Sequence, residues 1–433
     1  MKKVAFYTLG CKVNQYETEA VAELFEAEDY ELVSFEEKAD VYVINTCTVT
    51  SMSDRKSRQA IRKAKKNNEH AVVVVIGCYA QTSPEEVRNI PGVNLVIGTK
   101  DRNKIINYLD KFKAVETNAN YVVDIANNIE FEKLNVKTYK EHARAFIKIQ
   151  DGCNQYCTYC IIPYARGPIR SKRPEDVLNE ARELGEKGFK EIVLTGIHIA
   201  SYGKDIKTTS LMDIIERVHG VEGVERIRIG SIEPNIVTSE FIEEAKNLRK
   251  LCPHYHLSLQ SGCDRTLKRM NRKYTTEDYK KVVALLRENV PDVAITTDIM
   301  VGFPGETDEE FETTYRFLEE ISFAKMHVFK YSARKGTPAA SFREQIPPEI
   351  KEVRSRRLIE LSYTNTLNFN RSYIGRVMPV LFEQEKGNGF IEGLTMNYIR
   401  VVCKGDKALK GEISAVELDA LKDDFTYGLI VKK

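Results

Sequence analysis

Apolar positions in the first hundred residues alternate between strand-like and helix-like spacing. The run Ala71–Ile76 is apolar throughout, which is typical of a parallel strand covered by helices on both faces. The predicted strands are Lys3–Leu9, Asp40–Thr46, Ala71–Ile76 and Asn94–Ile97. The predicted helices are Glu17–Glu28, Ser53–Lys66 with Ser53 or Asp54 as N-cap, and one that begins at Ser83-Pro84 with proline at its first position. This order predicts an open parallel α/β sheet.

The alternation of strand-like and helix-like segments is lost over residues 111–143 and then resumes. The lost stretch is rich in Asn, Lys, Glu and Thr, so we interpret it as a linker that lies over a neighbouring domain. Six strand–helix units follow, with strands at Ala145–Ile149, Glu191–Leu194, Arg226–Ile229, His256–Leu259, Ala294–Met300 and Lys325–Tyr331. A closed barrel of this kind has about eight units, so we predict a partial barrel with an open side.

The last part of the chain follows a different pattern. A basic helix is predicted over Glu349–Arg371, and five short strands are predicted between Val377 and Val431. Five strands in so short a stretch suit a small barrel of the kind that binds oligonucleotides. The expected domains are 1–112, a linker over 113–143, 144–370 and 371–433.

Charge and composition limit the surfaces and the cellular compartment that can be expected for the protein. The 433 residues carry a net charge of only +2, so any nucleic-acid surface must be a local patch. No signal-peptide core is present, and no apolar run reaches the roughly 18 residues that span a membrane. Nine cysteines in such a chain indicate a reducing, cytoplasmic compartment, where they act as metal ligands or catalytic groups.

Cys153, Cys157 and Cys160 form a C-x3-C-x2-C loop directly after the strand Ala145–Ile149. Three thiolates on one loop can hold three corners of a four-iron cluster and leave one iron open, whereas electron carriers use four cysteines per cluster. Zinc with a distant fourth cysteine is the alternative. A disulfide is less favoured, because so tight a loop cannot pair three thiols.

Cys11, Cys47 and Cys78 each follow a predicted strand of the first sheet. Parallel strands place their carboxyl ends at one edge of the sheet, where open α/β sheets bind ligands. We therefore expect these three cysteines to meet in space and form a second three-thiolate site. The alternative is three separate buried cysteines.

An open iron is suited to a chelating amino-carboxylate, and S-adenosylmethionine carries one. The glycine-rich end Gly302–Gly305 would let the backbone approach its adenosine part, although an ordinary turn is the alternative. Glu233 and Arg334 are candidate partners for its amino and carboxylate groups. For either residue alone, a structural ion pair is an equal alternative.

These residues carry a resemblance to a known family. TLGCKVNQYE, INTCTV, GCYAQ, GCNQYCTYCIIPYARG, SLQSGCDRTLKRMNRKY, DIMVGFPGET and YSARKGTPA resemble the radical S-adenosylmethionine methylthiotransferases over nearly the whole chain. The final segment resembles their TRAM domain. GCKVN followed by NTCTV looks most like the branch that acts on threonylcarbamoyladenosine in tRNA. Other branches act on isopentenyladenosine or on a ribosomal-protein aspartate.

The resemblance implies two 4Fe-4S clusters, with S-adenosylmethionine as methyl donor and radical source. Cys153, Cys157 and Cys160 would bind the radical-generating cluster, and Cys11, Cys47 and Cys78 an auxiliary cluster that carries the incoming sulfur. The methylthio group would join C2 of the modified adenosine beside the anticodon. The residues assigned to S-adenosylmethionine are Tyr159, Thr195, Gly196, Glu233, Gln260, Asp298, Gly302 and Arg334. Cys252, Cys263 and Cys403 match no ligand and are expected to be structural.

The expected partner is the anticodon stem-loop of a tRNA, together with an external electron donor and a sulfur source, and we expect a monomer. Two basic runs lie near the predicted cysteine sites, where phosphates would be held. The first is Arg166, Arg170, Lys172 and Arg173; the second is Arg55, Lys56, Arg58, Arg62, Lys63, Lys65 and Lys66. A solvated helix face is the better interpretation for the outward part of the second run. A zinc-stabilised RNA-binding module, a radical enzyme acting on a protein and a two-cluster electron carrier are the rival hypotheses.

Overall fold

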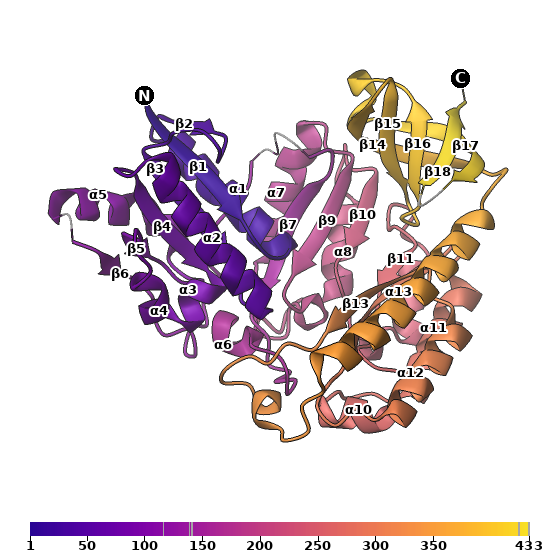
Figure 1. The fold of residues 1–433 in the computed structure, drawn as a ribbon. Helices are drawn as coiled ribbons and strands as arrows, with labels where there is room; N and C mark the ends of the chain where they lie inside the picture. Colours follow the sequence, from indigo (N-terminus) through magenta and orange to yellow (C-terminus); the bar gives the residue numbers. More distant parts are fainter. Residues whose placement is uncertain (116, 138, 140–141, 423–424, 432–433) are drawn as a thin grey trace.

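The computed structural model describes every residue except 116, 138, 140–141, 423–424 and 432–433. It shows an N-terminal sheet with helices, a central arc of strands with helices outside it, and a C-terminal barrel (Figure 1). The fold class expected from the sequence is confirmed. Within the described residues, no helix has both the length and the apolar character needed to cross a bilayer.

Six parallel strands form the N-terminal sheet in the order β2-β1-β3-β4-β5-β6. They are β1 (Lys2–Thr8), β2 (Tyr30–Val33), β3 (Val41–Thr46), β4 (Val72–Gly77), β5 (Leu95–Val96) and β6 (Ala119–Asn120). The helices are α1 (Lys12–Glu26), α2 (Ser51–Asn67), α3 (Cys78–Thr82), α4 (Pro84–Arg88) and α5 (Ile105–Val115). Alternate side chains of β3 and β4 enter two apolar clusters, one on each face of the sheet. Strands β2 and β6 were not predicted, because they are short, half-buried edge strands without a clear apolar pattern.

Helix α2 begins earlier than its sequence predicts. Thr50 is the N-cap, and its hydroxyl accepts a hydrogen bond from the Ser53 amide at 3.2 Å. The prediction of Ser53 or Asp54 as the N-cap is therefore wrong, because Thr50 already satisfies a free amide of the first turn.

Six parallel strands and one short antiparallel strand form the central arc. They are β7 (Ala145–Asp151), β8 (Arg170–Ser171), β9 (Glu191–Gly196), β10 (Arg226–Ile229), β11 (His254–His256), β12 (Ala294–Val301) and β13 (Lys325–Lys330). The helices are α6 (Ile162–Arg166), α7 (Pro174–Glu186), α8 (Leu211–His219), α9 (Ser239–Ala245), α10 (Asp264–Arg269), α11 (Thr276–Asn289) and α12 (Asp308–Ile321). The arc divides into β10-β9-β7-β8 and β11-β12-β13, which are joined through single bridges such as Ile232 to Leu257. The partial barrel with an open side is confirmed.

The fourth barrel strand ends before its predicted range. β11 covers His254–His256, whereas the sequence predicts His256–Leu259. Leu257 and Gln260 still bond to β12 by their amides, but Gln260 has a φ of +72° that interrupts the regular ladder. The apolar pattern thus marks the buried stretch and not the regular part of the strand.

The stretch predicted as a linker packs over the central arc. Leu134, Val136 and Tyr139 belong to the apolar core of the arc, and Glu132 pairs with the buried Arg102. The first part of this stretch contains the end of α5 and strand β6. Residues 116, 138 and 140–141 lie outside the described residues, and the domain bounds given above stay a prediction.

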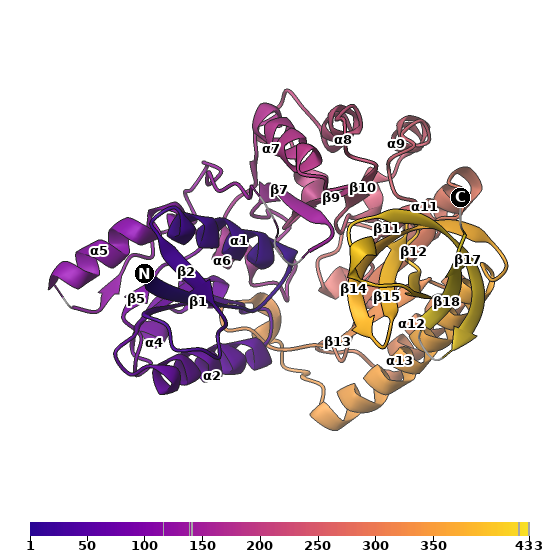
Figure 2. The same ribbon diagram turned by 90° about the horizontal axis from the view of Figure 1, so that it is seen from above.

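The C-terminal strands close into a barrel in the order β14-β15-β16-β18-β17. They are β14 (Val377–Gly387), β15 (Phe390–Thr395), β16 (Arg400–Lys404), β17 (Ile413–Lys422) and β18 (Phe425–Ile430), and α13 (Pro348–Arg371) leads into them. Arg226, the first residue of β10, donates to the carbonyls of Leu394 and Pro379. The barrel therefore packs at the amino ends of the central strands, and Figure 2 shows it across the arc from the N-terminal sheet.

Candidate active site

Cys11, Cys47 and Cys78 lie at the carboxyl edge of the N-terminal sheet. Cys11 is the N-cap of α1, Cys47 directly follows β3, and Cys78 is the first residue of α3. Burial raises the pKa of Cys78 to about 11, and Cys47 and Cys11 add to that shift electrostatically. The three thiols therefore share one neighbourhood, as the strand-end spacing predicts.

The turn into Cys78 requires glycine. Gly77 has a φ of +96°, and a Cβ there would lie 2.5 Å from Asn45 Oδ1 and 2.6 Å from the Thr46 carbonyl. Any larger residue would both strain this backbone and displace Asn45. The close approach of β3 and β4 at this point places Cys47 and Cys78 side by side at the edge.

Arg166 from the central domain reaches this cysteine group. Its Nε donates to Cys78 Sγ at 3.3 Å, and its Nη2 donates to Asn14 Oδ1 at 3.1 Å. The same Asn14 oxygen accepts from Cys11 Sγ at 3.5 Å, and Asn14 Nδ2 donates to Asn45 Oδ1 at 3.1 Å. The sequence reasoning missed Asn14 and Asn45, although both stand in the quoted motifs, three residues after Cys11 and two before Cys47.

Cys153, Cys157 and Cys160 lie on the loop that follows β7. Gly152 starts this loop with a φ of +74°, and a Cβ there would lie 1.9 Å from the Pro168 carbonyl oxygen. Burial raises the pKa of Cys153 to about 11 and that of Cys160 to about 12. The loop is thus packed tightly enough to hold three thiols in a fixed arrangement.

Arg272 and Glu233 support the cysteine loop. Arg272 Nη1 donates to Cys157 Sγ at 3.5 Å and pairs with Glu233 Oε1 at 3.1 Å. Gln155, inside the loop, donates to Glu233 Oε2 at 3.0 Å. The structure therefore places Glu233 beside the loop. Arg272 was not singled out from the sequence, although it lies within the quoted motif that starts at Ser258.

Both cysteine groups fit iron–sulfur clusters. All nine cysteines are free thiols, and in each group a guanidinium donates to one sulfur. Buried thiols with raised pKa values need a bound cation to become thiolates, which a cluster provides. Among the described residues, no three His, Cys, Asp or Glu side chains are set around one metal ion. Three cysteines per group can each bind one corner of a four-iron cluster and leave one iron open, so the donor set fits such a cluster.

The other residues assigned to S-adenosylmethionine mostly lie at strand ends of the arc. Thr195 and Gly196 end β9, and Gly302 follows β12 with a φ of +68° and an amide that donates to Glu306. The Gln260 amide donates to the Asp298 carbonyl. Asp298 pairs with His256 at 3.3 Å, and the Tyr159 ring packs edge-on against Phe303.

Arg334 contacts the N-terminal unit. Its guanidinium pairs with Asp54 and donates to Thr48 Oγ1 at 2.7 Å, which ties the segment after β13 to the start of α2. These contacts favour a structural ion pair, and the binding of S-adenosylmethionine by Arg334 stays a prediction.

The first basic run is mostly buried. Arg166, Arg170 and Lys172 are 0%, 2% and 3% exposed, and only Arg173 lies at the surface. Their carboxylate partners are Glu17, Asp151 and Glu180. Arg166 pairs with the N-terminal unit, whereas Arg170 and Lys172 pair within the central domain. These buried ion pairs favour a structural role for the three cations, and their contact with phosphates stays a prediction.

Glu17 is the centre of that buried network. Burial alone would raise its pKa, but Arg102, Arg166 and Lys148 lower the pKa of Glu17 to about 2. One carboxylate on α1 therefore holds three cations, two of them from the central domain. The network fixes the edge that carries Cys78 against the strand that carries the Cys153 loop.

Comparisons with known proteins agree with this geometry. Residues 3–98 match a family described as uncharacterized protein family UPF0004, and residues 147–318 match the radical SAM superfamily. The chain is 46% identical to the threonylcarbamoyladenosine tRNA methylthiotransferase MtaB of Bacillus subtilis, covering 99% of this chain and 95% of the relative. It belongs to the radical SAM tRNA methylthiotransferase family.

Other members of this family are also similar. The MtaB protein of Aquifex aeolicus is 41% identical over 94% of this chain and 97% of its own length. A tRNA-2-methylthio-N(6)-dimethylallyladenosine synthase of Acetivibrio thermocellus is 37% identical over 98% of this chain and 90% of its own length. Among solved structures, the radical S-adenosylmethionine methyltransferase TsrM of Kitasatospora setae aligns with a TM-score of 0.59 at 15% identity, covering 78% of this chain and 77% of TsrM. That likeness shows the fold.

Proposed function

We propose that this protein adds a methylthio group to C2 of N6-threonylcarbamoyladenosine, next to the anticodon of a tRNA. The observation that carries the reaction is the pair of three-cysteine groups, since Arg166 donates to Cys78 and pairs with Asp151, two residues before Cys153. The observation that favours this nucleoside is the identity to the two MtaB proteins, which exceeds that to the dimethylallyladenosine synthase.

Each cysteine group has its own cofactor in this proposal. Cys153, Cys157 and Cys160 hold the cluster that binds S-adenosylmethionine, and Cys11, Cys47 and Cys78 hold the auxiliary cluster. Together these groups supply a carbon radical, a sulfur and a methyl group to the reaction. S-adenosylmethionine is also contacted by Tyr159, Thr195, Gly196, Glu233, Gln260, Asp298 and Gly302.

The protein contributes positioning and shielding. Arg166 and Arg272 direct N–H groups at one sulfur of each cysteine group, which favours the thiolate form that binds iron. Glu233, held by Gln155 and Arg272, keeps a carboxylate beside the loop, where it suits the amino group of S-adenosylmethionine. Four of the six cysteines are buried, which limits the access of water to them, whereas Cys160 is half-buried and Cys11 is exposed.

The partners follow from the same proposal. The substrate is the anticodon stem-loop, and the reaction also needs an external electron donor and a sulfur source. The protein acts as a monomer in a reducing, cytoplasmic setting. Isopentenyladenosine in tRNA, or an aspartate of a ribosomal protein, is the alternative substrate.

Iron analysis tests the cofactor part of this proposal. Anaerobically prepared protein is expected to contain about eight irons, and alanine at all three cysteines of either group should halve that content. Alanine at Cys252, Cys263 and Cys403 together is the matched control and should leave the iron content unchanged. An unchanged iron content after replacing Cys11, Cys47 and Cys78 would refute the auxiliary site.

Product analysis tests the substrate. Stem-loop RNAs with threonylcarbamoyladenosine or isopentenyladenosine are incubated with the protein, S-adenosylmethionine, sulfide and a reductant, and their nucleosides are analysed by mass spectrometry. We expect the methylthio product from the first RNA. Transfer only to the second RNA, or only to a ribosomal protein, would select the corresponding alternative.

A further inference from the structure

Tyr398 of the C-terminal barrel inserts its ring into the central arc. The ring stacks on His254 of β11 with centroids 4.5 Å apart and planes 17° apart, and the guanidinium carbon of Arg228 lies 4.6 Å from the centroid. Tyr398 has a φ of +73°, which is unusual and costly for an aromatic residue. Arg228 holds this turn by donating to the Met396 carbonyl at 2.9 Å. Such a strained and fixed placement indicates a functional role.

Positive charge exceeds negative charge around this ring. One buried carboxylate, Glu191, is shared by Arg144 at 3.6 Å, Arg226 at 3.7 Å and Arg228 at 2.7 Å. The only other carboxylate in contact with these guanidinium groups among the described residues is Glu383, which pairs with Arg144. Lys12 adds a fourth cation, and its ammonium has no hydrogen-bond or ion-pair partner in the described part of the chain. Four cations thus face two carboxylates.

The titration of Tyr398 and His254 reflects this positive field. Burial alone would raise the pKa of Tyr398, yet Arg144, Lys12 and Arg228 lower it below its usual value. Burial lowers the pKa of His254 well below its usual value, and Arg228 and Lys12 lower it further. The shift of Tyr398 favours its negatively charged phenolate, and the shift of His254 favours its neutral imidazole. A bound anion would therefore be stabilised at this place.

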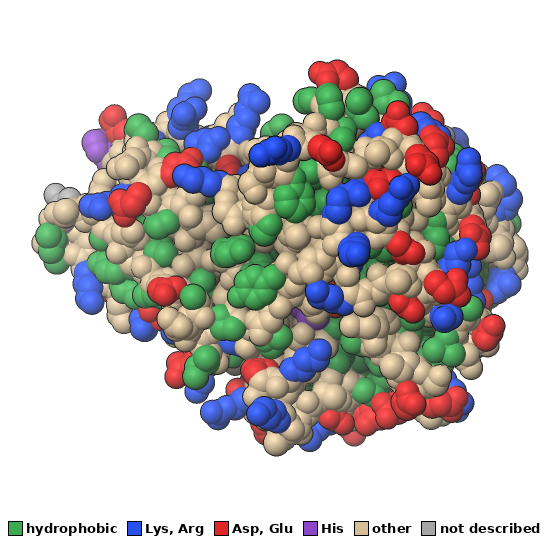
Figure 3. All heavy atoms as spheres, turned by 90° about the horizontal axis from the view of Figure 1, so that it is seen from below, with side chains coloured by type: hydrophobic (Ala, Val, Ile, Leu, Met, Phe, Trp, Pro, Cys, Tyr) green, Lys and Arg blue, Asp and Glu red, His purple; other side chains and the backbone are tan. Residues whose placement is uncertain are grey.

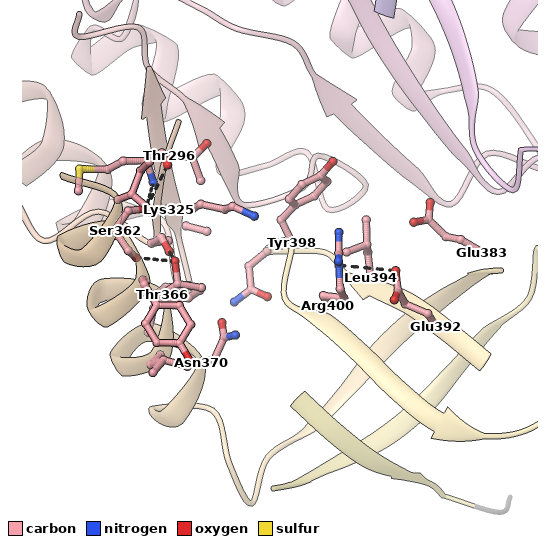
Figure 4. Close-up of a pocket in the computed structure, with 18 of the residues that line it drawn as sticks. Thr296, Lys325, Ser362, Thr366, Asn370, Glu383, Glu392, Leu394, Tyr398 and Arg400 are labelled. Carbon is pink, nitrogen blue, oxygen red and sulfur yellow. Dashed lines mark hydrogen bonds and ion pairs between the residues drawn. The ribbon is translucent and has the colours of Figure 1, made fainter. Parts of the chain in front are cut away.

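There is room for a ligand beside Tyr398. A cavity of about 380 Å³ lies between the central strands and the C-terminal barrel. Its lining includes Tyr398, the cations Arg144, Lys325 and Arg400, and the carboxylates Glu383 and Glu392. Figure 4 shows Tyr398 between the group around Thr296 and Lys325 on one side and Arg400 with Glu392 on the other. Tyr398 and Arg144 belong both to this cavity lining and to the group of cations around the ring.

We propose that Lys12, Arg144, Arg228 and Tyr398 bind the carboxylate that the substrate adenosine carries on its N6 side chain. This inference rests on the function proposed above, since a threonylcarbamoyl group ends in a carboxylate. Lys12 directly follows Cys11, so it lies beside the proposed auxiliary site. C2 and N6 belong to the same nucleobase, so a base with C2 at the cysteines keeps its N6 side chain close to Lys12.

The charge of this group also explains substrate choice. A dimethylallyl side chain is neutral and apolar and cannot replace the water lost from four cations. A carboxylate both matches their charge and accepts their hydrogen bonds. The group would therefore favour an acidic nucleoside over an apolar one in the same tRNA position.

Binding of matched RNAs tests this inference. Stem-loops that carry threonylcarbamoyladenosine, its methyl ester or isopentenyladenosine are titrated with the holoenzyme and followed by fluorescence anisotropy. The wild type should bind the acid about 10- to 100-fold more tightly than the ester, as expected for a charged hydrogen-bonded contact. Lys12→Met and Tyr398→Phe should each reduce that ratio and leave the affinity for the ester unchanged. Tyr398→Phe keeps the stacked ring, so it reports on the hydroxyl alone.

Lys281→Met on α11 is the control, because the Lys281 side chain is exposed and pairs only with Glu277 of its own helix among the described residues. It should keep the wild-type ratio. If Lys12→Met weakens the acid and the ester RNAs equally, the group binds a phosphate of the tRNA and the inference is wrong. An acid-to-ester ratio near one in the wild type also overturns it, even if both RNAs are methylthiolated. A high ratio without any methylthio transfer would support the carboxylate group and refute the proposed function.

Discussion

At the scale of single residues, each cysteine group accepts a hydrogen bond from one arginine. Arg166 donates to Cys78 and Arg272 donates to Cys157, and both guanidinium groups are held by buried carboxylates. Hydrogen bonds to the sulfurs of an iron–sulfur cluster raise its reduction potential. The two arginines are therefore expected to tune the two clusters separately.

Arg166→Lys keeps the charge but changes the donor at Cys78. We expect the potential of the auxiliary cluster to become more negative by tens of millivolts, because the N–H bond to the sulfur is lost or weakened. The potential is measured by an EPR-monitored redox titration in protein whose Cys153, Cys157 and Cys160 are alanine, so only one cluster contributes. Arg272→Lys in the same background is the control and should have no effect. An unchanged potential in Arg166→Lys would contradict the assigned contact.

Arg334 gives a second residue-scale prediction. Arg334→Met leaves Asp54 buried without its cation, which should destabilise the protein by about 3 kcal/mol. The affinity for S-adenosylmethionine, measured by equilibrium dialysis, should not change. Asp54→Asn combined with Arg334→Met should recover part of the lost stability in urea unfolding. A large loss of S-adenosylmethionine affinity in Arg334→Met would instead show that Arg334 binds S-adenosylmethionine.

The positions of the cysteines could be predicted from the sequence, but the roles of the charged residues could not. Cys11, Cys47 and Cys78 follow strands whose apolar patterns are clear, so their common edge follows from the parallel topology. Arg166 and Arg334 each find a partner more than a hundred residues away in the chain. A basic residue near a cysteine therefore does not reveal whether its partner is a phosphate, a cofactor or a carboxylate.

At the scale of elements, α1 connects the two units that carry the cysteines. Lys12 and Asn14 lie next to the cysteine edge, Tyr16 donates to the Leu134 carbonyl, and Glu17 binds cations from β7 and α6. The sequence predicts this helix only from Glu17 onward, because its first turn is polar and carries few apolar positions. The missed part of the helix contains Asn14 and Tyr16, whose hydrogen bonds to Arg166 and to the Leu134 carbonyl add to the ion pairs of Glu17.

Glu17→Gln tests the network on α1. At neutral pH it should lower the free energy of unfolding by about 3 to 5 kcal/mol, because Arg102, Arg166 and Lys148 lose their shared carboxylate. The pKa of Glu17 is about 2 in the folded protein, below its usual value of 4.5, so its contribution is complete above that usual value. It is lost as the pH falls from about 4.5 toward 2.

The measurement compares urea unfolding of the wild type and Glu17→Gln from neutral pH to about 3. The difference in the free energy of unfolding between the two proteins should be constant at the higher pH values and shrink at the lowest pH values. Glu28→Gln, at an exposed position just past the end of the same helix, is the control for a general effect of acid. A difference that does not depend on pH would mean that Glu17 is not ionised in the folded protein.

At the scale of the whole molecule, charges are mixed and nearly balanced. The net charge is +2, and Figure 3 shows acidic and basic side chains interspersed over the face seen from below, with hydrophobic side chains gathered near its middle. Attraction for RNA must therefore come from local groups of cations. With Arg166, Arg170 and Lys172 buried, the exposed cations left in the two basic runs are Arg173 and several on α2, among them Arg55 and Lys56.

The affinity for the tRNA should fall as salt rises, because each phosphate contact releases counterions. Arg55 and Lys56 lie in the exposed first turns of α2, a few residues after Cys47, and no ion pair is shown for either among the described residues. If both hold phosphates of the single-stranded loop, Arg55→Gln with Lys56→Gln should reduce the slope of log affinity against log salt by about 1.4. Lys66→Gln at the far end of the same helix is the matched control, because it also removes a lysine charge, but from a solvated face.

Anisotropy titrations over a range of salt concentrations give the slopes. A flat profile in the wild type would contradict RNA binding itself, whereas an equal slope in the double variant would move the phosphate contacts away from α2 and toward Arg173.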